Sequence, residues 1–120
     1  SMTGPSLAQA LSPTTTGVIA ILTVKTGVTR EQVLTVMPAE VRETVQLYLN
    51  GTIREWYSRG DGRGGVFLLD TKDVAEAQAI MERLPLAKAS FMDDEYIALG
   101  PLFPLRLLMA NPVAKQTFNT

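Results

Sequence analysis

The chain has 120 residues, of which 46% are hydrophobic and 19% charged, as is typical of one globular domain with one modest core. Eleven basic residues against twelve acidic ones give a net charge of −1, and the absence of a basic stripe argues against nucleic acid as a partner. There is no Cys and no His, so proton transfer near neutral pH must use a carboxylate, Tyr, Lys or water.

The N-terminal part of the chain is predicted to hold a loose arm and a first strand. Residues 1–16 are small, polar and rich in Thr and Pro, which predicts a flexible N-terminal arm. The run 18–24 is apolar except for Thr23 and rich in β-branched residues, which predicts a strand buried on both faces of a sheet. It is too short to cross a bilayer and no signal-peptide pattern precedes it, so we expect a cytoplasmic protein without a membrane partner.

A helix is predicted to begin at Thr29, because Gln32 follows at capping-box spacing. The pair Met37-Pro38 is predicted to restart this helix, and Asn50-Gly51 to end it. Its expected buried residues recur at helical spacing and are Val41, Val45, Tyr48 and Leu49.

The next segments predict a hairpin, a second helix and a last strand. Strands are expected at 52–59 and 66–69, joined by the glycine-rich loop 60–65. This loop is not expected to cradle a phosphate, because a strand follows it and not a helix. Thr71 is predicted to cap the second helix, which ends at Pro85. Its expected buried residues are Val74, Ala77, Met81 and Leu84.

The fourth strand is expected at 91–99, followed by an apolar C-terminal arm, 102–120, which we expect to pack on a partner subunit. The order β-α-β-β-α-β predicts an α+β, ferredoxin-like domain over residues 17–101. Such a domain has a four-stranded antiparallel sheet with both helices on one face. The other face of these strands would be apolar and exposed, which predicts a homodimer or a higher homo-oligomer.

Five short segments lie in order along the chain: 49–61 (LNGTIREWYSRGD), 65–69 (GVFLL), 84–86 (LPL), 92–95 (MDDE) and 99–101 (LGP). Together they resemble the muconolactone isomerase family, and the resemblance runs from about residue 19 to residue 101. It implies a dimeric α/β barrel and a cofactor-free proton shift in an unsaturated lactone.

Individual positions agree with that family only in part. The resemblance matches Thr52, Arg54, Asp93 and Glu95 to residues of the true isomerases, whereas Ile53 and Glu55 stand where those enzymes carry Trp and His. The missing Trp and His argue against the specific muconolactone activity.

The candidate catalytic residues come from the second and fourth strands. Strict alternation predicts Glu55, Tyr57 and Arg59 on one face of the second strand, with Arg54 and Trp56 on the other. Glu95 or Asp93 is the predicted base with a raised pKa, while Arg59 or Arg54, together with Tyr57, is predicted to stabilise the anion. The alternative is that both carboxylates are solvated at a frayed strand start or paired with an Arg.

The predicted ligand cavity lies between the sheet and its covering elements. Its expected binding residues are Glu55, Trp56, Phe67, Leu69 and Phe91. Trp56 has the alternative role of a packing anchor. No metal site is expected at the acidic run 93–95, because strand alternation sends its middle residue to the opposite face, and no cofactor is expected.

The first functional hypothesis is a cofactor-free isomerase or cyclase that moves a proton in a small unsaturated lactone or another carbonyl-containing ring compound. It predicts a cavity that holds a carboxylate with a raised pKa opposite an Arg or a Tyr. The second hypothesis is a non-catalytic binding or structural module, in which side chains fill the barrel while Asp93 and Glu95 face water. A cofactor-free monooxygenase is the third.

Overall fold

The computed structural model describes residues 13–102, so most of the two predicted arms, 1–16 and 102–120, lies outside the described residues. Residues 15–99 form one compact unit. Its elements in chain order are β1 (Gly17–Val24), α2 (Arg30–Leu49), β2 (Ile53–Ser58), β3 (Gly64–Leu69), α3 (Val74–Met81), α4 (Pro85–Lys88) and β4 (Met92–Leu99). None of the helices in this described part is long and apolar enough to cross a membrane.

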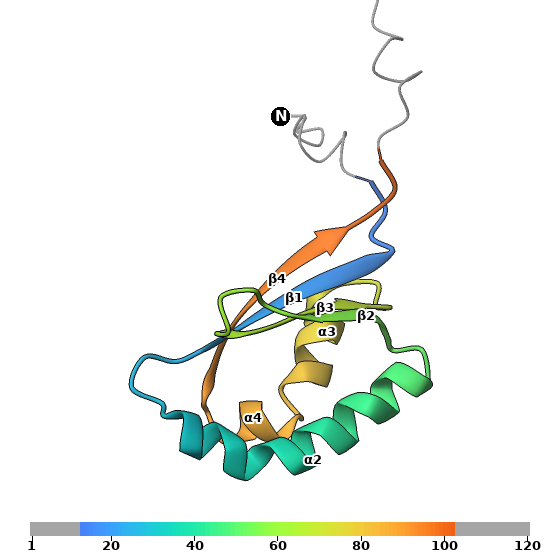
Figure 1. The fold of residues 1–120 in the computed structure, drawn as a ribbon. Coiled ribbons are helices and arrows are strands. Elements are labelled where there is room, and N and C mark those ends of the chain that lie inside the picture. Colours follow the sequence, from blue (N-terminus) through green and yellow to red (C-terminus); the bar gives the residue numbers. More distant parts are fainter. Residues whose placement is uncertain (1–12, 103–120) are drawn as a thin grey trace, which may run out of the picture. The chain divides into compact units, whose positions relative to one another are not determined.

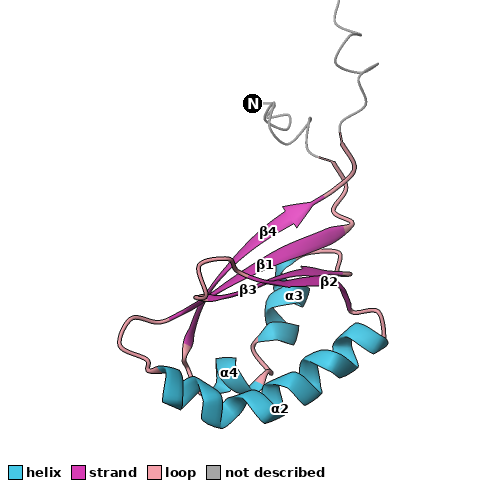
Figure 2. Cartoon of the chain, in the orientation of Figure 1, coloured by secondary structure: helices cyan, strands magenta, loops and turns pink. Residues whose placement is uncertain are grey.

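The four strands form one sheet in the order β2-β3-β1-β4, and every neighbouring pair is antiparallel. The three helices lie on the same side of this sheet (Figures 1 and 2). The order of elements and the strand order confirm the predicted ferredoxin-like α+β fold.

The two faces of the sheet differ because the strands alternate. The face toward the helices holds the core, which includes Val18, Ala20, Leu22, Ile53, Leu69, Ala77, Met81 and Leu84. We call the other side the open face; its apolar residues are Ile19, Ile21, Val66, Leu68, Ile97 and Leu99. Ile97 is 44% exposed and Leu99 37%, so the apolar surface that the sequence predicted is present on this side.

Helix α2 begins as predicted but presents a different side to the sheet. Thr29 and Gln32 form a complete capping box, and Asn50 caps the end. Pro38 lies inside one continuous helix, so the predicted restart is wrong.

The predicted buried face of α2 is also wrong. The stripe 41, 45, 48 and 49 is exposed, whereas Glu40 and Thr44 are buried. The residues that face the sheet lie one position N-terminal to the predicted ones. Glu40 and Thr44 are tolerated there because both side chains are hydrogen-bonded.

The second helical region has a different cap and a different end from those predicted. Asp73 is the N-cap of α3 and accepts a hydrogen bond from the backbone N–H of Glu76, whereas Thr71 is buried before the helix begins. The inner residues Ala77 and Met81 are buried as predicted. Pro85 follows the end of α3 and opens the short helix α4.

A β-bulge in β2 changes which of its side chains share a face. The pairing with β3 shifts between Ile53 and Glu55, so Arg54 is the extra residue. Ile53 therefore shares the helix side with Trp56, while the guanidinium of Arg54 lies against Gly17 of β1. The strict alternation predicted for this strand is wrong at its first two residues.

Candidate functional site

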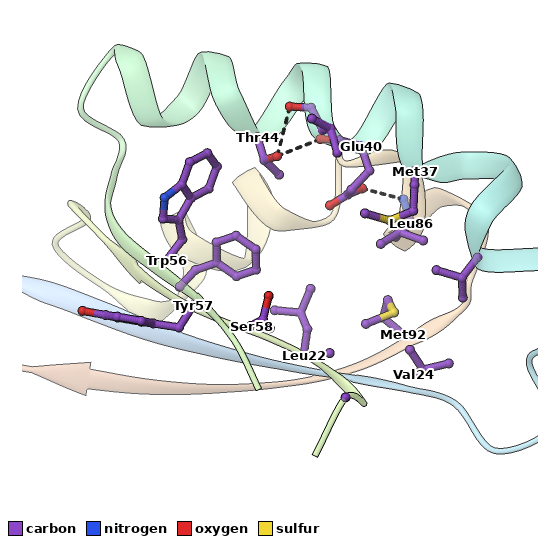
Figure 3. Close-up of a pocket in the computed structure, with 16 residues that line it drawn as sticks. Leu22, Val24, Met37, Glu40, Thr44, Trp56, Tyr57, Ser58, Leu86 and Met92 are labelled. Atoms are coloured by element: carbon purple, nitrogen blue, oxygen red, sulfur yellow. Dashed lines mark hydrogen bonds between the residues drawn. The ribbon is translucent and has the colours of Figure 1, made fainter. Parts of the chain in front are cut away.

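A cavity of about 460 Å³ lies between α2 and the sheet, and we call it the α2 cavity (Figure 3). Its walls come from β1, α2, β2, the β2–β3 hairpin, α4 and β4. The residues that line it are Leu22, Val24, Val33, Met37, Glu40, Val41, Thr44, Trp56, Tyr57, Ser58, Gly62, Gly64, Gly65, Phe67, Leu86 and Met92. A mostly apolar cavity with a few converging polar groups is the usual form of a small-molecule site.

The carboxyl group of Glu40 is the acidic group of this cavity. Glu40 is only 4% exposed. Its Oε1 accepts a hydrogen bond of 2.9 Å from the backbone N–H of Leu86, which is the second residue of α4. The other carboxyl oxygen points into the cavity (Figure 3). One oxygen is therefore held in place while the other stays available to a ligand.

The surroundings of Glu40 favour its protonated form. Burial raises the pKa of the Glu40 carboxyl above the ordinary 4.5, the hydrogen bond from Leu86 opposes this, and the negative charge of Glu43 raises the pKa further. A carboxyl group with a raised pKa can take up and return a proton at a higher pH than an ordinary carboxyl group.

Two hydroxyl groups accompany Glu40. The Thr44 hydroxyl donates to the backbone oxygen of Glu40 at 2.8 Å and lies 3.2 Å from that of Val41, so it is engaged within α2. Ser58 extends its hydroxyl from β2 toward the cavity, across from the helix (Figure 3). Ser58 is therefore the available hydrogen-bond donor on the sheet side.

Aromatic rings form the wall next to the hydroxyls. The ring of Trp56 stacks on that of Tyr48 from α2, with centroids 4.6 Å apart and an interplanar angle of 1°. Trp56 and Phe67 pair across β2 and β3, and both line the cavity. The packing role and the binding role predicted for Trp56 are compatible, because its ring both stacks on α2 and faces the cavity.

The hairpin supplies a part of the cavity that only glycine can build. Gly64 has a φ of 154°, and a Cβ on it would meet the backbone carbonyl of Leu22. A side chain at this position would push β3 away from β1. Gly64 thus allows the start of β3 to lie close to the backbone of β1, at the edge of the cavity.

Most of the sequence-predicted catalytic residues lie on the open face, away from the α2 cavity. By strand register, Asp93 and Glu95 share that side with the apolar residues of β1, and both are exposed. Tyr57 is 60% exposed and donates its hydroxyl to Glu55; although Tyr57 borders the cavity, its side chain runs away from it (Figure 3).

The two predicted arginines are engaged with neighbouring groups. Arg59 donates to the Thr23 hydroxyl and, at 2.6 Å, to Asp61 in the hairpin loop. Arg54 donates to the backbone oxygen of Thr16 and lies 3.6 Å from Asp70. The predicted partners of Glu95 and Asp93 are thus spread along the opposite edge of the sheet.

Of the other predicted binding residues, Trp56 and Phe67 line the α2 cavity. Leu69 is fully buried in the core, and Phe91 is half-buried; neither lines the cavity. Within residues 13–102, no group of three or more acidic side chains is placed to hold a metal ion.

Sequence reasoning missed Glu40, the group that gives this cavity its chemistry. Glu40 lies in the run Val33, Met37, Glu40, Thr44, which has helical spacing. An acidic residue that follows Val33 and Met37 at helical spacing is the sequence feature that could have identified it. The neighbouring stripe of Val41, Val45 and Tyr48 is more apolar and concealed it.

The titration of Glu40 predicts a pH dependence of stability. The pKa of Glu40 in the folded chain is raised above the unfolded value of 4.5. Glu40 therefore makes its full favourable contribution to the free energy of unfolding below pH 4.5, and this contribution is lost as pH rises through the folded pKa. We therefore expect the free energy of unfolding of the wild type to fall, relative to that of Glu40→Gln, between pH 4.5 and neutral pH. Urea unfolding followed by far-ultraviolet circular dichroism at both pH values measures this. A difference that does not change with pH would contradict it.

Comparison with known proteins yields a structural match. No protein-family model matches the sequence, and no curated protein matches it. Among solved structures, the chain is similar to a crystal structure of muconolactone isomerase at 3.3 Å resolution. The TM-score is 0.56 at 18% sequence identity, and the match covers 69% of this chain and 86% of that chain. This similarity supports the ferredoxin-like fold.

Proposed function

We propose that the protein is an isomerase or cyclase that transfers a proton within a small carbonyl-containing ring compound, such as an unsaturated lactone, bound in the α2 cavity. The observation that carries this proposal is a buried carboxyl group with a raised pKa that faces an apolar cavity of about 460 Å³. The chain shares its fold with muconolactone isomerase, and this fold-level analogy makes that class of reaction the first one to test.

The proposed reaction needs one group that moves a proton and one that stabilises an oxyanion. The ionised Glu40 removes a proton from the carbon next to the carbonyl, and the electron pair of that C–H bond passes into a dienolate. The Ser58 hydroxyl is placed to donate a hydrogen bond to the oxyanion. Glu40 then returns the proton to the far carbon of the dienolate. This step moves the double bond and regenerates the carboxylate.

Exchange of carbon-bound hydrogen tests the proposal on many candidate substrates at once. A panel of unsaturated lactones and cyclic enones, muconolactone included, is incubated with the protein in D₂O and followed by proton NMR. Loss of the signal from the carbon that yields its proton, or appearance of the isomer, faster than in buffer alone, is the expected result for at least one ring. That carbon is next to the carbonyl in a β,γ-unsaturated ring and at the γ-position in a conjugated one. Absence of both exchange and isomerisation across the panel would favour the second candidate function.

That second candidate is a binding module without catalysis. One observation favours it: Thr44 is engaged within its own helix, so Ser58 is the single hydroxyl free to assist Glu40. In such a module Glu40 would orient a ligand by hydrogen bonding, and saturable binding without exchange would be observed.

The open face supports a proposal for assembly, in which a second copy of the chain covers it. The register places Arg59, which directly follows β2, level with Asp93 of β4, and Tyr57 of β2 level with Glu95, on opposite edges of the sheet. If the two copies were related by a two-fold axis parallel to the strands, the β2 edge of one copy would lie over the β4 edge of its partner. Basic and acidic side chains would then meet around an apolar centre.

This arrangement would give the predicted open-face residues a role at the interface. We expect the wild type to sediment as a dimer or a higher oligomer at micromolar concentration, and Val66→Glu to sediment as a monomer with an unchanged far-ultraviolet spectrum. Val66 lies in the middle of the open face, where a buried carboxylate would oppose association. Leu34→Glu is the matched control, because Leu34 is 50% exposed on α2. A wild type that sediments as a monomer would contradict the proposal.

A further inference from the structure

We infer that the α2 cavity selects an uncharged ring compound with a carbonyl or hydroxyl group and discriminates against rings that carry a carboxylate. This inference rests on the proposed function, since it names the ligand class of the same cavity. It concerns the charge of the ligand, which the fold alone does not determine.

The first observation is the charge of the lining. Of the residues that line the cavity, none is Lys, Arg or His, and Glu40 is the acidic one. The phenol of Tyr57 runs away from the cavity. A ligand inside the cavity therefore meets apolar side chains, the indole of Trp56, two hydroxyls and one carboxyl group, and no cation to pair with.

The second observation is the position of two arginines that line a neighbouring pocket. Arg30, the first residue of α2, and Arg63, in the hairpin loop, line an adjoining and more open pocket of about 430 Å³. The two pockets share four residues, Val24, Val33, Met37 and Gly62. Both arginines are exposed, and neither lines the α2 cavity. Their charge is therefore screened by water and offers no direct partner to an anion next to Glu40.

The energetic consequence differs for the three ligand charges. A carboxylate would lose its hydration and lie close to the carboxyl of Glu40, where two negative charges repel or one must take up a proton. An ammonium group would require an ionised Glu40, although burial favours the neutral form. A carbonyl can accept a hydrogen bond from protonated Glu40 or from Ser58, and a hydroxyl can donate to ionised Glu40. The uncharged ligand avoids both costs.

Isothermal titration calorimetry of the full chain at pH 7 tests the inference with three probes of nearly equal shape. They are 2-acetylnaphthalene, which is uncharged, 2-naphthoate, which is an anion, and 2-naphthylmethylammonium, which is a cation. We expect the ketone to bind most tightly, with the carboxylate roughly 30-fold weaker or more. In Glu40→Gln, which keeps the acceptor for Leu86, we expect the carboxylate to gain about tenfold while the ketone changes by less than about threefold.

Each other outcome overturns the inference. Equal binding of ketone and carboxylate would do so, as would tighter binding of the ammonium probe or no binding of the ketone. The control is Glu43→Gln, which removes a neighbouring charge that does not line the cavity, so the order of the three probes should be preserved. Calorimetry reports selectivity and NMR reports proton exchange. An anion-preferring protein that exchanges hydrogen would refute the inference alone, and a ketone-selective protein without exchange would refute only the reaction.

Discussion

Glu40→Gln is expected to lower the rate of carbon–hydrogen exchange by about 100-fold or more, because an amide cannot take up and return a proton. Gln has nearly the same size, and its carbonyl can accept the 2.9 Å hydrogen bond from the Leu86 N–H. The fold and the cavity should therefore remain intact. Exchange rates measured by NMR, with circular dichroism to verify folding, provide the test.

The informative control for this variant is Glu95→Gln on the open face. Glu95 is the base that the sequence predicts, and the structure places it on the side of the sheet away from Glu40. If exchange survives in Glu95→Gln and is lost in Glu40→Gln, the reaction takes place in the α2 cavity. The reverse pattern would move it to the open face, where Arg59 and Tyr57 of a partner copy would be the expected anion-stabilising groups.

Leu69→Ala is expected to lower the free energy of unfolding by about 2–5 kcal/mol, since it removes a buried side chain and leaves a cavity. Leu69 is 0% exposed and pairs with both Ile53 and Val18, so it joins β1, β2 and β3 in the core. A loss of this size is a large part of the roughly 5–15 kcal/mol that stabilises a typical domain. Urea unfolding at a fixed protein concentration measures it.

The same chemical change at an exposed position provides the reference. Leu49 is 77% exposed at the end of α2, and we expect Leu49→Ala to change the free energy of unfolding by less than about 0.5 kcal/mol. Similar effects for the two variants would mean that Leu69 does not lie in the core described above.

The fold could be predicted because its signals are local. A continuous apolar run marks β1, the pair Thr29 and Gln32 marks the start of α2, and a glycine-rich loop between two β-rich segments marks the hairpin. Each of these patterns involves residues that are close in the sequence, so the structure that it favours does not depend on distant parts of the chain. The element order then restricts the topology to few arrangements.

The site could not be predicted because its signals depend on distant parts of the chain. Glu40 is tolerated on the inner side of α2 because Leu86, 46 residues later, donates its backbone N–H to it. The bulge at Arg54 depends on pairing between β2 and β3, and it reverses the side on which that arginine lies. Hydrophobic periodicity contains no information on these long-range contacts. It therefore assigned the wrong side of α2 to the core and the wrong side of β2 to Arg54.

The stacked pair of Tyr48 and Trp56 has a spectroscopic consequence. Trp56 is the only tryptophan of the chain, so all of its indole fluorescence originates at the wall of the α2 cavity. The two parallel rings, 4.6 Å apart, join the end of α2 to β2, and their coupled transitions should give a near-ultraviolet dichroism band. That band would vanish when the helix separates from the sheet, even while the helix itself persists. The near-ultraviolet dichroism of this pair therefore reports whether α2 is packed on the sheet.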